Sequence, residues 1–235
     1  GPGLGAWSRL QGLVTGAAGE ALIAYSAGSR DPARAAAHLR FSAEIFPQLE
    51  EQGVRLARRL VATGFTRPDL EVVLPRFRSG IEIFREENLP LFSELEELSA
   101  SYQRLTGGIT VEWEGETRTL PQLGPFLKSP DRAVRERAFR AMGAPYIAMR
   151  DQLAGLFDEM YSRRQRVATN AGFADFEAYS FAAKCRFDYT PDDVTRFHEA
   201  VEAEVVPAVT RILEMRKQAL GLDVLRPWDL DVDPA

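Results

Sequence analysis

Apolar residues recur every three or four positions through most of this chain, which is the spacing of helices that bury one face. A helix-start signal, an acid followed by proline, stands at Asp31-Pro32. Proline inside a segment should bend or divide it, so we expect irregularities at Pro47 and Pro75 and an interruption near residues 143–145. The segments with helical spacing are residues 7–27, 31–60, 70–84, 91–105, 131–169, 175–184 and 191–220.

Residues 109–120, ITVEWEGETRTL, carry the one clear strand-like pattern, an alternation followed by a Glu-Gly turn and threonines. Direct pairing across a two-residue loop would place Trp113 beside Glu116 and Thr110 beside Thr119. Two strands alone are marginal in water, so the hairpin must pack on helices or join another strand. The sequence therefore predicts a mainly α fold with one small β-hairpin.

The last fifty residues, 186–235, contain a long predicted helix and an irregular exit. Pro191 suits the first helical position, and Gly221 stands where a left-handed residue ends a helix. Between them, apolar residues form a stripe that we interpret as one buried helix face. The members of this stripe are Val194, Phe197, Val201, Val205, Ala208 or Val209, Ile212 and Leu220.

Asp229, Asp231 and Asp233 alternate in that exit in the manner of a calcium loop. An EF-hand loop requires glycine at its sixth position and a bidentate Glu at its twelfth. Pro234 stands at the sixth position, and no later residue supplies the Glu. We therefore reject a calcium site and predict a strand-like segment with its acids on one face.

Charge and composition narrow the class of protein. The 235 residues include 29 Lys plus Arg and 34 Asp plus Glu, a net charge of −5, so no nucleic-acid partner is expected. No apolar run reaches the roughly 18–20 residues of a membrane span, and the first residues do not resemble a signal peptide. Cys185 is the only cysteine, which excludes an internal disulfide and favours a reducing, cytoplasmic location.

The chain offers few candidates for chemistry. His38 and His198 are its only histidines, and neither has a second histidine one helical turn away. Because a zinc hydrolase usually needs such a pair and a nearby Glu, we predict no metal site and no catalytic residue here. His38 and Cys185 fit structural roles, and His198 fits a solvated or capping role on a helix rim. The basic run at residues 163–166, RRQR, is most simply a solvated helix face; the alternative is a cluster that catches a peptide carboxylate.

Three pieces of sequence together resemble the oligoendopeptidase F family of zinc metallopeptidases, relatives of thimet oligopeptidase. The first is the hairpin with the segment directly after it, ITVEWEGETRTLPQLGPFLKSPDRAVRERAFRA. The second is the upstream segment FREENLPLFSELEELSASYQRLTG, and the third is the helix exit LGLDVLRPWDLDVDP. Their order and spacing carry the resemblance, which covers roughly residues 81–234.

The resemblance implies a multi-helical oligopeptidase lobe, one of two around a deep channel in which short peptides are cut at internal bonds. It also implies a zinc ion held by a His-Glu-x-x-His helix and a later Glu. That helix would lie beyond residue 235, so the chain is expected to be truncated before the zincin helix and inactive alone. No position here matches the family's zinc ligands, general base or substrate-binding Tyr and His. No catalytic or metal residue is therefore carried over, and the substrate-binding residues stay unassigned.

The resemblance also suggests a division of the chain. We expect residues 1–107 to form an amino-terminal helical region, 108–185 the hairpin plus helices of the oligopeptidase F type, and 186–235 the start of a catalytic domain. The expected partners are an oligopeptide substrate and the missing carboxy-terminal catalytic part, which would bring the zinc. An apolar surface should be exposed where that part docks. Two alternatives remain: a non-catalytic helical scaffold or peptide-interaction module with the same fold, and a helical regulator with a carboxylate-binding basic groove.

Overall fold

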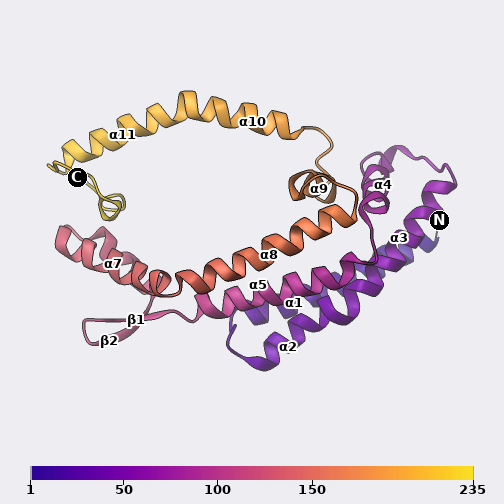
Figure 1. Cartoon of the computed structure of the whole chain (residues 1–235), viewed down its shortest axis with the longest axis horizontal. Helices are drawn as coiled ribbons and strands as arrows, with labels where there is room; N and C mark the ends of the chain where they lie inside the picture. The colour runs from indigo at the N-terminus through magenta and orange to yellow at the C-terminus, as the bar shows by residue number, and fades with distance from the viewer. Residues whose placement is uncertain (1, 235) are drawn as a thin grey trace. The chain divides into compact units, whose positions relative to one another are not determined.

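The computed structural model describes residues 2–234, with side chains for 3–68 and 70–234, and it confirms a mainly α fold with one hairpin (Figure 1). Within the described residues, no helix combines the length and the apolar content that crossing a bilayer would require. The elements are α1 (Pro2–Ser26), α2 (Pro32–Arg40), η1 (Phe41–Ile45), α3 (Phe46–Ala62), η2 (Pro68–Leu70), α4 (Val73–Ile83), α5 (Asn88–Gly107), β1 (Thr110–Trp113), β2 (Glu116–Thr119), α6 (Leu120–Leu123), η3 (Gly124–Lys128), α7 (Arg132–Ala148), α8 (Arg150–Asn170), α9 (Phe176–Ala183), α10 (Pro191–Ala200), η4 (Val201–Val205), α11 (Val206–Ala219) and η5 (Pro227–Asp229).

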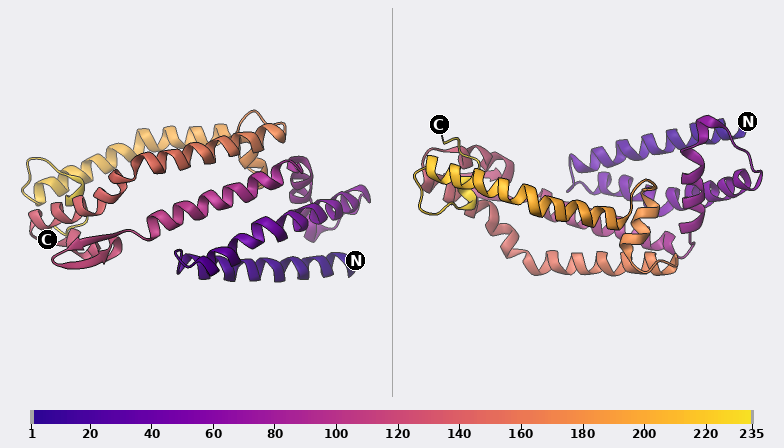
Figure 2. Two further views of the ribbon diagram at one scale, coloured as in Figure 1. Left: turned by 60° about the horizontal axis from the view of Figure 1, so that its bottom comes forward. Right: turned by 90° about the horizontal axis from the view of Figure 1, so that it is seen from above.

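These elements form two compact units, each made of two chain segments. Unit 1 runs up to Gly107 and includes residues 155–191, and unit 2 consists of residues 108–154 and the chain from Asp192 onward. In unit 1, α1 runs beside the α2–η1–α3 segment in the opposite direction (Figure 2). The Tyr25 hydroxyl of α1 is fully buried and donates to the Ala100 carbonyl of α5 at 2.7 Å. This bond fixes α1 against the centre of the unit.

The start of α5 and the end of α8 share the main apolar core of unit 1. Asn88 is almost fully buried; its amide donates to the Val167 carbonyl at 3.0 Å and its oxygen accepts from Asn170 at 2.8 Å. Because buried polar groups are costly without partners, these bonds pin the two helix ends together. The buried members of the core cluster are Leu91, Val167, Ala168, Ala171 and Tyr179.

Two helices contain a wide turn directly before a proline. The π turn η1 precedes Phe46-Pro47, where the Phe46 N–H donates to the Phe41 carbonyl five residues back. The π turn η4 precedes Val206-Pro207, with the corresponding bond from Val206 to Val201. Proline cannot donate to the carbonyl four residues back and its ring crowds that carbonyl, so a widened turn relieves both problems. The expected irregularity at Pro47 is therefore confirmed as a π turn.

The helix irregularities expected at Pro75 and near residues 143–145 are not found at those positions. Pro75 stands in the first turn of α4, where its missing N–H costs no helical bond, and Leu70 belongs to the separate turn η2. The interruption expected near residues 143–145 is wrong, because α7 continues through Pro145 to Ala148. The break comes at Met149, with φ −97° and ψ 9°. Proline's fixed φ fits a helix, so α7 can proceed beyond it with one bond missing.

The hairpin of unit 2 has the predicted register. Trp113 pairs with Glu116 and Thr110 with Thr119, and Gly115 in the turn has a positive φ of 83°. Trp113 is 6% exposed and packs on Leu123 of α6 and Ala138 of α7. The hairpin thus packs on helices, which is what two strands need to be stable.

Candidate functional site

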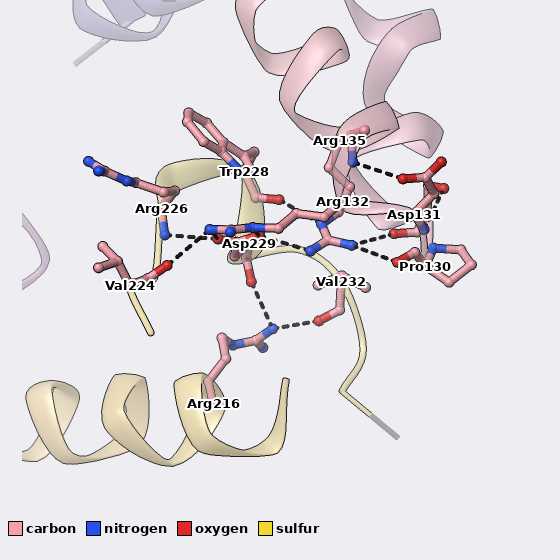
Figure 3. Close-up of polar contacts among 12 residues, drawn as sticks. Pro130, Asp131, Arg132, Arg135, Arg216, Val224, Arg226, Trp228, Asp229 and Val232 are labelled. Atoms are coloured by element: carbon pink, nitrogen blue, oxygen red, sulfur yellow. Dashed lines mark hydrogen bonds and ion pairs between the residues drawn. The ribbon is translucent and has the colours of Figure 1, made fainter. Parts of the chain in front are cut away.

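A buried carboxylate joins two elements of unit 2, η5 and α7. Asp229 is fully buried, and its Oδ1 accepts from Arg135 at 2.8 Å and from Arg132 Nε at 3.1 Å (Figure 3). Its Oδ2 accepts from Arg132 at 2.8 Å and from the Arg226 backbone N–H at 2.9 Å. Four donors therefore surround one carboxylate. We call Arg132, Arg135 and Asp229 the Asp229 cluster.

The local sequence on both sides builds this cluster. Asp131 caps α7 by accepting from the Ala133 N–H at 2.8 Å, and the first turn then places Arg132 and Arg135 three residues apart. Opposite them, Pro227 begins the 3-10 turn η5, whose last residue is Asp229. The order Ser-Pro-Asp-Arg on one segment and Arg-Pro-Trp-Asp on the other thus makes two turns that fit each other.

Further bonds extend the cluster to the backbone. The Arg135 side chain also donates to the carbonyls of Ser129 at 2.8 Å, Pro130 at 3.0 Å and Trp228 at 3.1 Å. Arg216 of α11 donates to the Val232 carbonyl (Figure 3). The segment after α11 is therefore attached to α7 at one side and to α11 at the other.

The pKa of Asp229 reflects this surrounding. Burial alone would raise it, but hydrogen bonds from Arg132 and Arg135, the Arg226 N–H and the charge of Arg132 together lower it to about 2. The carboxylate is thus ionised at every physiological pH and has no spare oxygen position directed at solvent. It is suited to hold structure and is not suited to accept a proton or bind a metal.

This geometry corrects the prediction for the acidic exit. Asp229, Asp231 and Asp233 do not lie on one face of a strand, because residues 227–229 form a 3-10 turn and no strand follows within the described residues. Asp229 turns inward to two arginines, whereas Asp231 is exposed. The sequence patterns considered above do not single out Arg132, Arg135 and Asp229 as a set. The two proline-led turns, each next to an arginine, were the signal that could have revealed them.

The second feature of unit 2 is an exposed apolar helix face. Across residues 191–219, all of which the structure describes, no residue is buried. Phe197 is 66% exposed and Ile212 is 61% exposed. The prediction that this stripe is a buried helix face is therefore wrong for this chain, because no described element covers it. We call this the α10–α11 face, and its exposed members are Phe197, Val205, Val206, Val209, Ile212, Leu213 and Met215.

The residues singled out from the sequence fall into scattered places. His38 stacks on Tyr25 with ring centroids 5.3 Å apart, and its Nε2 lies 3.7 Å from Glu96. His198 is exposed on α10 of unit 2, and Cys185 is half-buried after α9 in unit 1. Arg163 of the basic run bonds to Glu94 at 3.0 Å and to Glu159. The structure does not gather these residues into one site.

The described residues do not fit a zinc site. Among the side chains that the structure describes, those of residues 3–68 and 70–234, no group of three or more His, Cys, Asp or Glu is placed to hold a metal ion. The two histidines belong to different units.

Comparison with known proteins gives one family match and several structural matches. Residues 126–232, which contain the Asp229 cluster, match Peptidase family M3. A search of curated proteins finds no match. A solved oligoendopeptidase F aligns with a TM-score of 0.86 and 26% identity over 92% of this chain and 39% of its own.

Two further solved structures give the same picture of the fold. An oligoendopeptidase F from Bacillus anthracis strain Ames aligns with a TM-score of 0.83 and 23% identity over 90% of this chain and 40% of its own. PZ peptidase A with inhibitor 2 aligns with a TM-score of 0.84 and 24% identity over 90% of this chain and 38% of its own. The chain thus spans about 40% of the length of these structures. As predicted from the sequence, the chain resembles the oligoendopeptidases F along most of its length, and residues 126–232 match Peptidase family M3.

Proposed function

We propose that this chain is the amino-terminal part of a zinc metalloendopeptidase that hydrolyses internal bonds of short oligopeptides. The observation that carries the proposal is the alignment of 92% of the chain with only 39% of an oligoendopeptidase F, at a TM-score of 0.86. The Peptidase family M3 match over residues 126–232 supports a peptidase as the parent protein. In this proposal the chain supplies one wall of the substrate channel and is inactive alone.

The zinc site belongs, in this proposal, to a carboxy-terminal part outside the chain. That part would carry His-Glu-x-x-His, and a zinc ion held there would lower the pKa of a bound water and polarise the scissile carbonyl. Residues 1–107 and 108–185 would be the amino-terminal regions and 186–235 the start of the catalytic domain. The lone Cys185 supports a reducing, cytoplasmic location.

The α10–α11 face supports the existence of such a partner part. Isolated exposed apolar residues are common, but a contiguous apolar helix face is typical of an interaction surface. Phe197, Val205, Val209 and Ile212 are spaced by about one or two helical turns and are all at least 45% exposed. In the proposal, the carboxy-terminal part packs on this face, and the Asp229 cluster fixes the direction in which the chain leaves α11.

A fluorescence-quenched peptide assay tests the proposal. The chain alone, with and without added Zn²⁺, should hydrolyse no peptide above the zinc blank. A longer product of the same gene that contains His-Glu-x-x-His should hydrolyse it, and a zinc chelator should abolish that activity. Hydrolysis by the chain alone would contradict the proposed inactivity. A gene product that ends without a zinc motif would instead favour the alternative, a non-catalytic helical scaffold or peptide-interaction module with the same fold.

A further inference from the structure

Exposed cations gather in the part of unit 1 where α4 packs on α3 and on α9 (Figure 1). Residues 55–78 and 184–189 together contain eight cations and three acids, in a chain whose net charge is −5. The three arginines of α3 occur at positions i, i+3 and i+4, which are neighbours on one helix face. We use the name basic patch for the following exposed cations: Arg55, Arg58, Arg59, Arg76, Arg78 and Lys184.

The basic patch lacks acidic partners within the described residues. No ion pair or hydrogen bond between described residues engages its charged groups. By contrast, Arg40 of the same unit lies 3.0 Å from Glu44, an acid four residues away. Like charges four residues apart on a helix repel each other, so the pair Arg55 and Arg59 destabilises α3 slightly. A partner with negative charge would remove that repulsion.

Large apolar side chains are exposed among these cations. Phe65, in the connector between α3 and α4, is 42% exposed. Val72, directly before α4, is 70% exposed, and Phe187, after α9, is 52% exposed. Val72 and Phe187 line one surface hollow together with Arg76 and Lys184. The hollow therefore places apolar and cationic side chains on one surface, where the start of α4 meets the end of α9.

This combination fits an anionic lipid bilayer better than a soluble polyanion. Each Lys or Arg close to an anionic bilayer strengthens binding by about fivefold, and an apolar side chain gains further by leaving water at the boundary between headgroups and acyl chains. Nucleic acids and acidic peptides match the charge of the basic patch but offer no apolar phase to Phe65 or Val72. The connector that holds Phe65 is exposed from Thr63 to Pro68, so a flat surface can reach it.

We propose that unit 1 binds peripherally to an anionic lipid bilayer through the basic patch, while Phe65, Val72 and Phe187 enter the headgroup boundary. The attraction between the cations and the lipid headgroups is electrostatic, so salt screens it. The apolar side chains add a contribution that comes from leaving water and does not depend on lipid charge. Such binding requires neither a membrane-spanning helix nor a zinc ion, so it does not depend on the proposed peptidase function.

Co-sedimentation of the chain with lipid vesicles tests this binding. The chain should sediment with vesicles of phosphatidylcholine and phosphatidylglycerol at low salt and should stay in solution with phosphatidylcholine alone. About 1 M NaCl should release it from the anionic vesicles. No binding to the anionic vesicles, or equal binding to phosphatidylcholine alone, would overturn the proposal.

Paired arginine variants place the binding at the basic patch. The double variant Arg58→Gln, Arg59→Gln should weaken binding to the anionic vesicles about 20-fold or more, since two cations are lost. The double variant Arg9→Gln, Arg30→Gln is the matched control, because both arginines are exposed in unit 1 outside the basic patch. It should weaken binding less than about twofold. Equal effects of the two double variants would rule out the basic patch as the binding surface.

One substitution at two exposed apolar positions tests the contribution of the connector. Phe65→Ser should weaken binding to the anionic vesicles about fivefold or more. Ile212→Ser, at a 61% exposed position of the α10–α11 face, should weaken it less than about twofold. Equal effects would show that vesicles bind to any exposed apolar surface of the chain. An oligonucleotide or oligoglutamate that binds as tightly as the vesicles, with no effect of Phe65→Ser, would identify a soluble polyanion as the partner. Either result would overturn the proposal.

Discussion

Two helical segments of this protein have the same local construction and opposite surroundings. The α2–η1–α3 segment and the α10–η4–α11 segment both start with proline and both contain a π turn before a second proline. In the first, Val54 and Ala57 are buried, and the Ser42 carbonyl accepts from the Ser93 hydroxyl of α5 at 2.7 Å. In the second, no residue is buried. Local signals therefore specify the helix and its wide turn, while a neighbouring element decides whether its apolar face is covered.

The largest expected effect is on the stability of unit 2, where the Asp229 cluster attaches the segment after α11 to α7. Asp229→Ala leaves the Arg135 guanidinium buried without its carboxylate, so unit 2 should lose about 3–5 kcal/mol of unfolding free energy. Asp231→Ala, at an exposed neighbouring acid, should change it by less than about 0.5 kcal/mol. Urea unfolding followed by tryptophan fluorescence measures both, in a Trp7→Phe background that leaves only Trp113 and Trp228 of unit 2. Equal losses would mean that the Asp229 cluster does not anchor the segment.

The same kind of substitution, an apolar residue to Asp, should have different effects on the buried face of α3 and on the exposed α10–α11 face. Val54→Asp buries a charge in α3 and should destabilise unit 1 by about 2–4 kcal/mol. Ile212→Asp adds the same charge to the α10–α11 face, where it should cost less than about 0.5 kcal/mol. Ile212→Asp should instead reduce the fluorescence of a hydrophobic dye bound to the chain. A large loss of stability in Ile212→Asp would show that this face is covered in solution.

These comparisons indicate what the sequence could and could not predict. Helix positions, the hairpin register and the left-handed Gly221, with φ 63°, follow from short-range signals and are confirmed. The predicted burial of the apolar stripe on α10–α11 is wrong. Periodicity indicates which face of a helix is apolar, but it does not show whether another element covers that face. The inward turn of Asp229 could not be predicted from the alternating acids, because its partners lie 94 and 97 positions earlier in the chain.

The two units should also lose stability at opposite ends of the pH scale, unit 2 at low pH and unit 1 at high pH. The folded pKa of Asp229, about 2, lies below its usual 3.8, so the stability that it contributes is complete above about pH 4 and is lost as the pH falls toward 2. The folded pKa of Tyr179, about 12, lies above its usual 10, so its contribution is complete below pH 10 and is lost as the pH rises toward 12. Urea midpoints measured against pH for the chain and for Asp229→Ala and Tyr179→Phe test this. Asp229→Ala should remove only the loss of stability at low pH, and Tyr179→Phe should remove only the loss at high pH.

The smallest expected effect is that of replacing Pro47 or Pro207, the prolines that follow the π turns η1 and η4. Pro207→Ala restores an N–H donor on an uncovered helix, so η4 can close into a regular α turn and stabilise unit 2 by up to about 1 kcal/mol. Pro47→Ala restores the same donor in α3, but the packed neighbours resist the rotation that closing the turn requires, so η1 should persist. Amide hydrogen exchange at the new alanine distinguishes the two results. Strong protection at position 47 would show that packing does not hold its turn open.

The Asp229 cluster also has a consequence for how this protein is made. Arg132 and Arg135 leave the ribosome long before Asp229, which comes 97 and 94 residues later. Until then the first turn of α7 has its Asp131 cap, but Arg132 and Arg135 lack the Asp229 carboxylate. Closing so long a loop is slow compared with forming a helix. During synthesis, unit 2 must therefore wait until residue 229 has been made, while unit 1, whose last residue is 191, can already fold. A truncation a few residues before Asp229 would be expected to leave unit 2 as a target for proteases and chaperones.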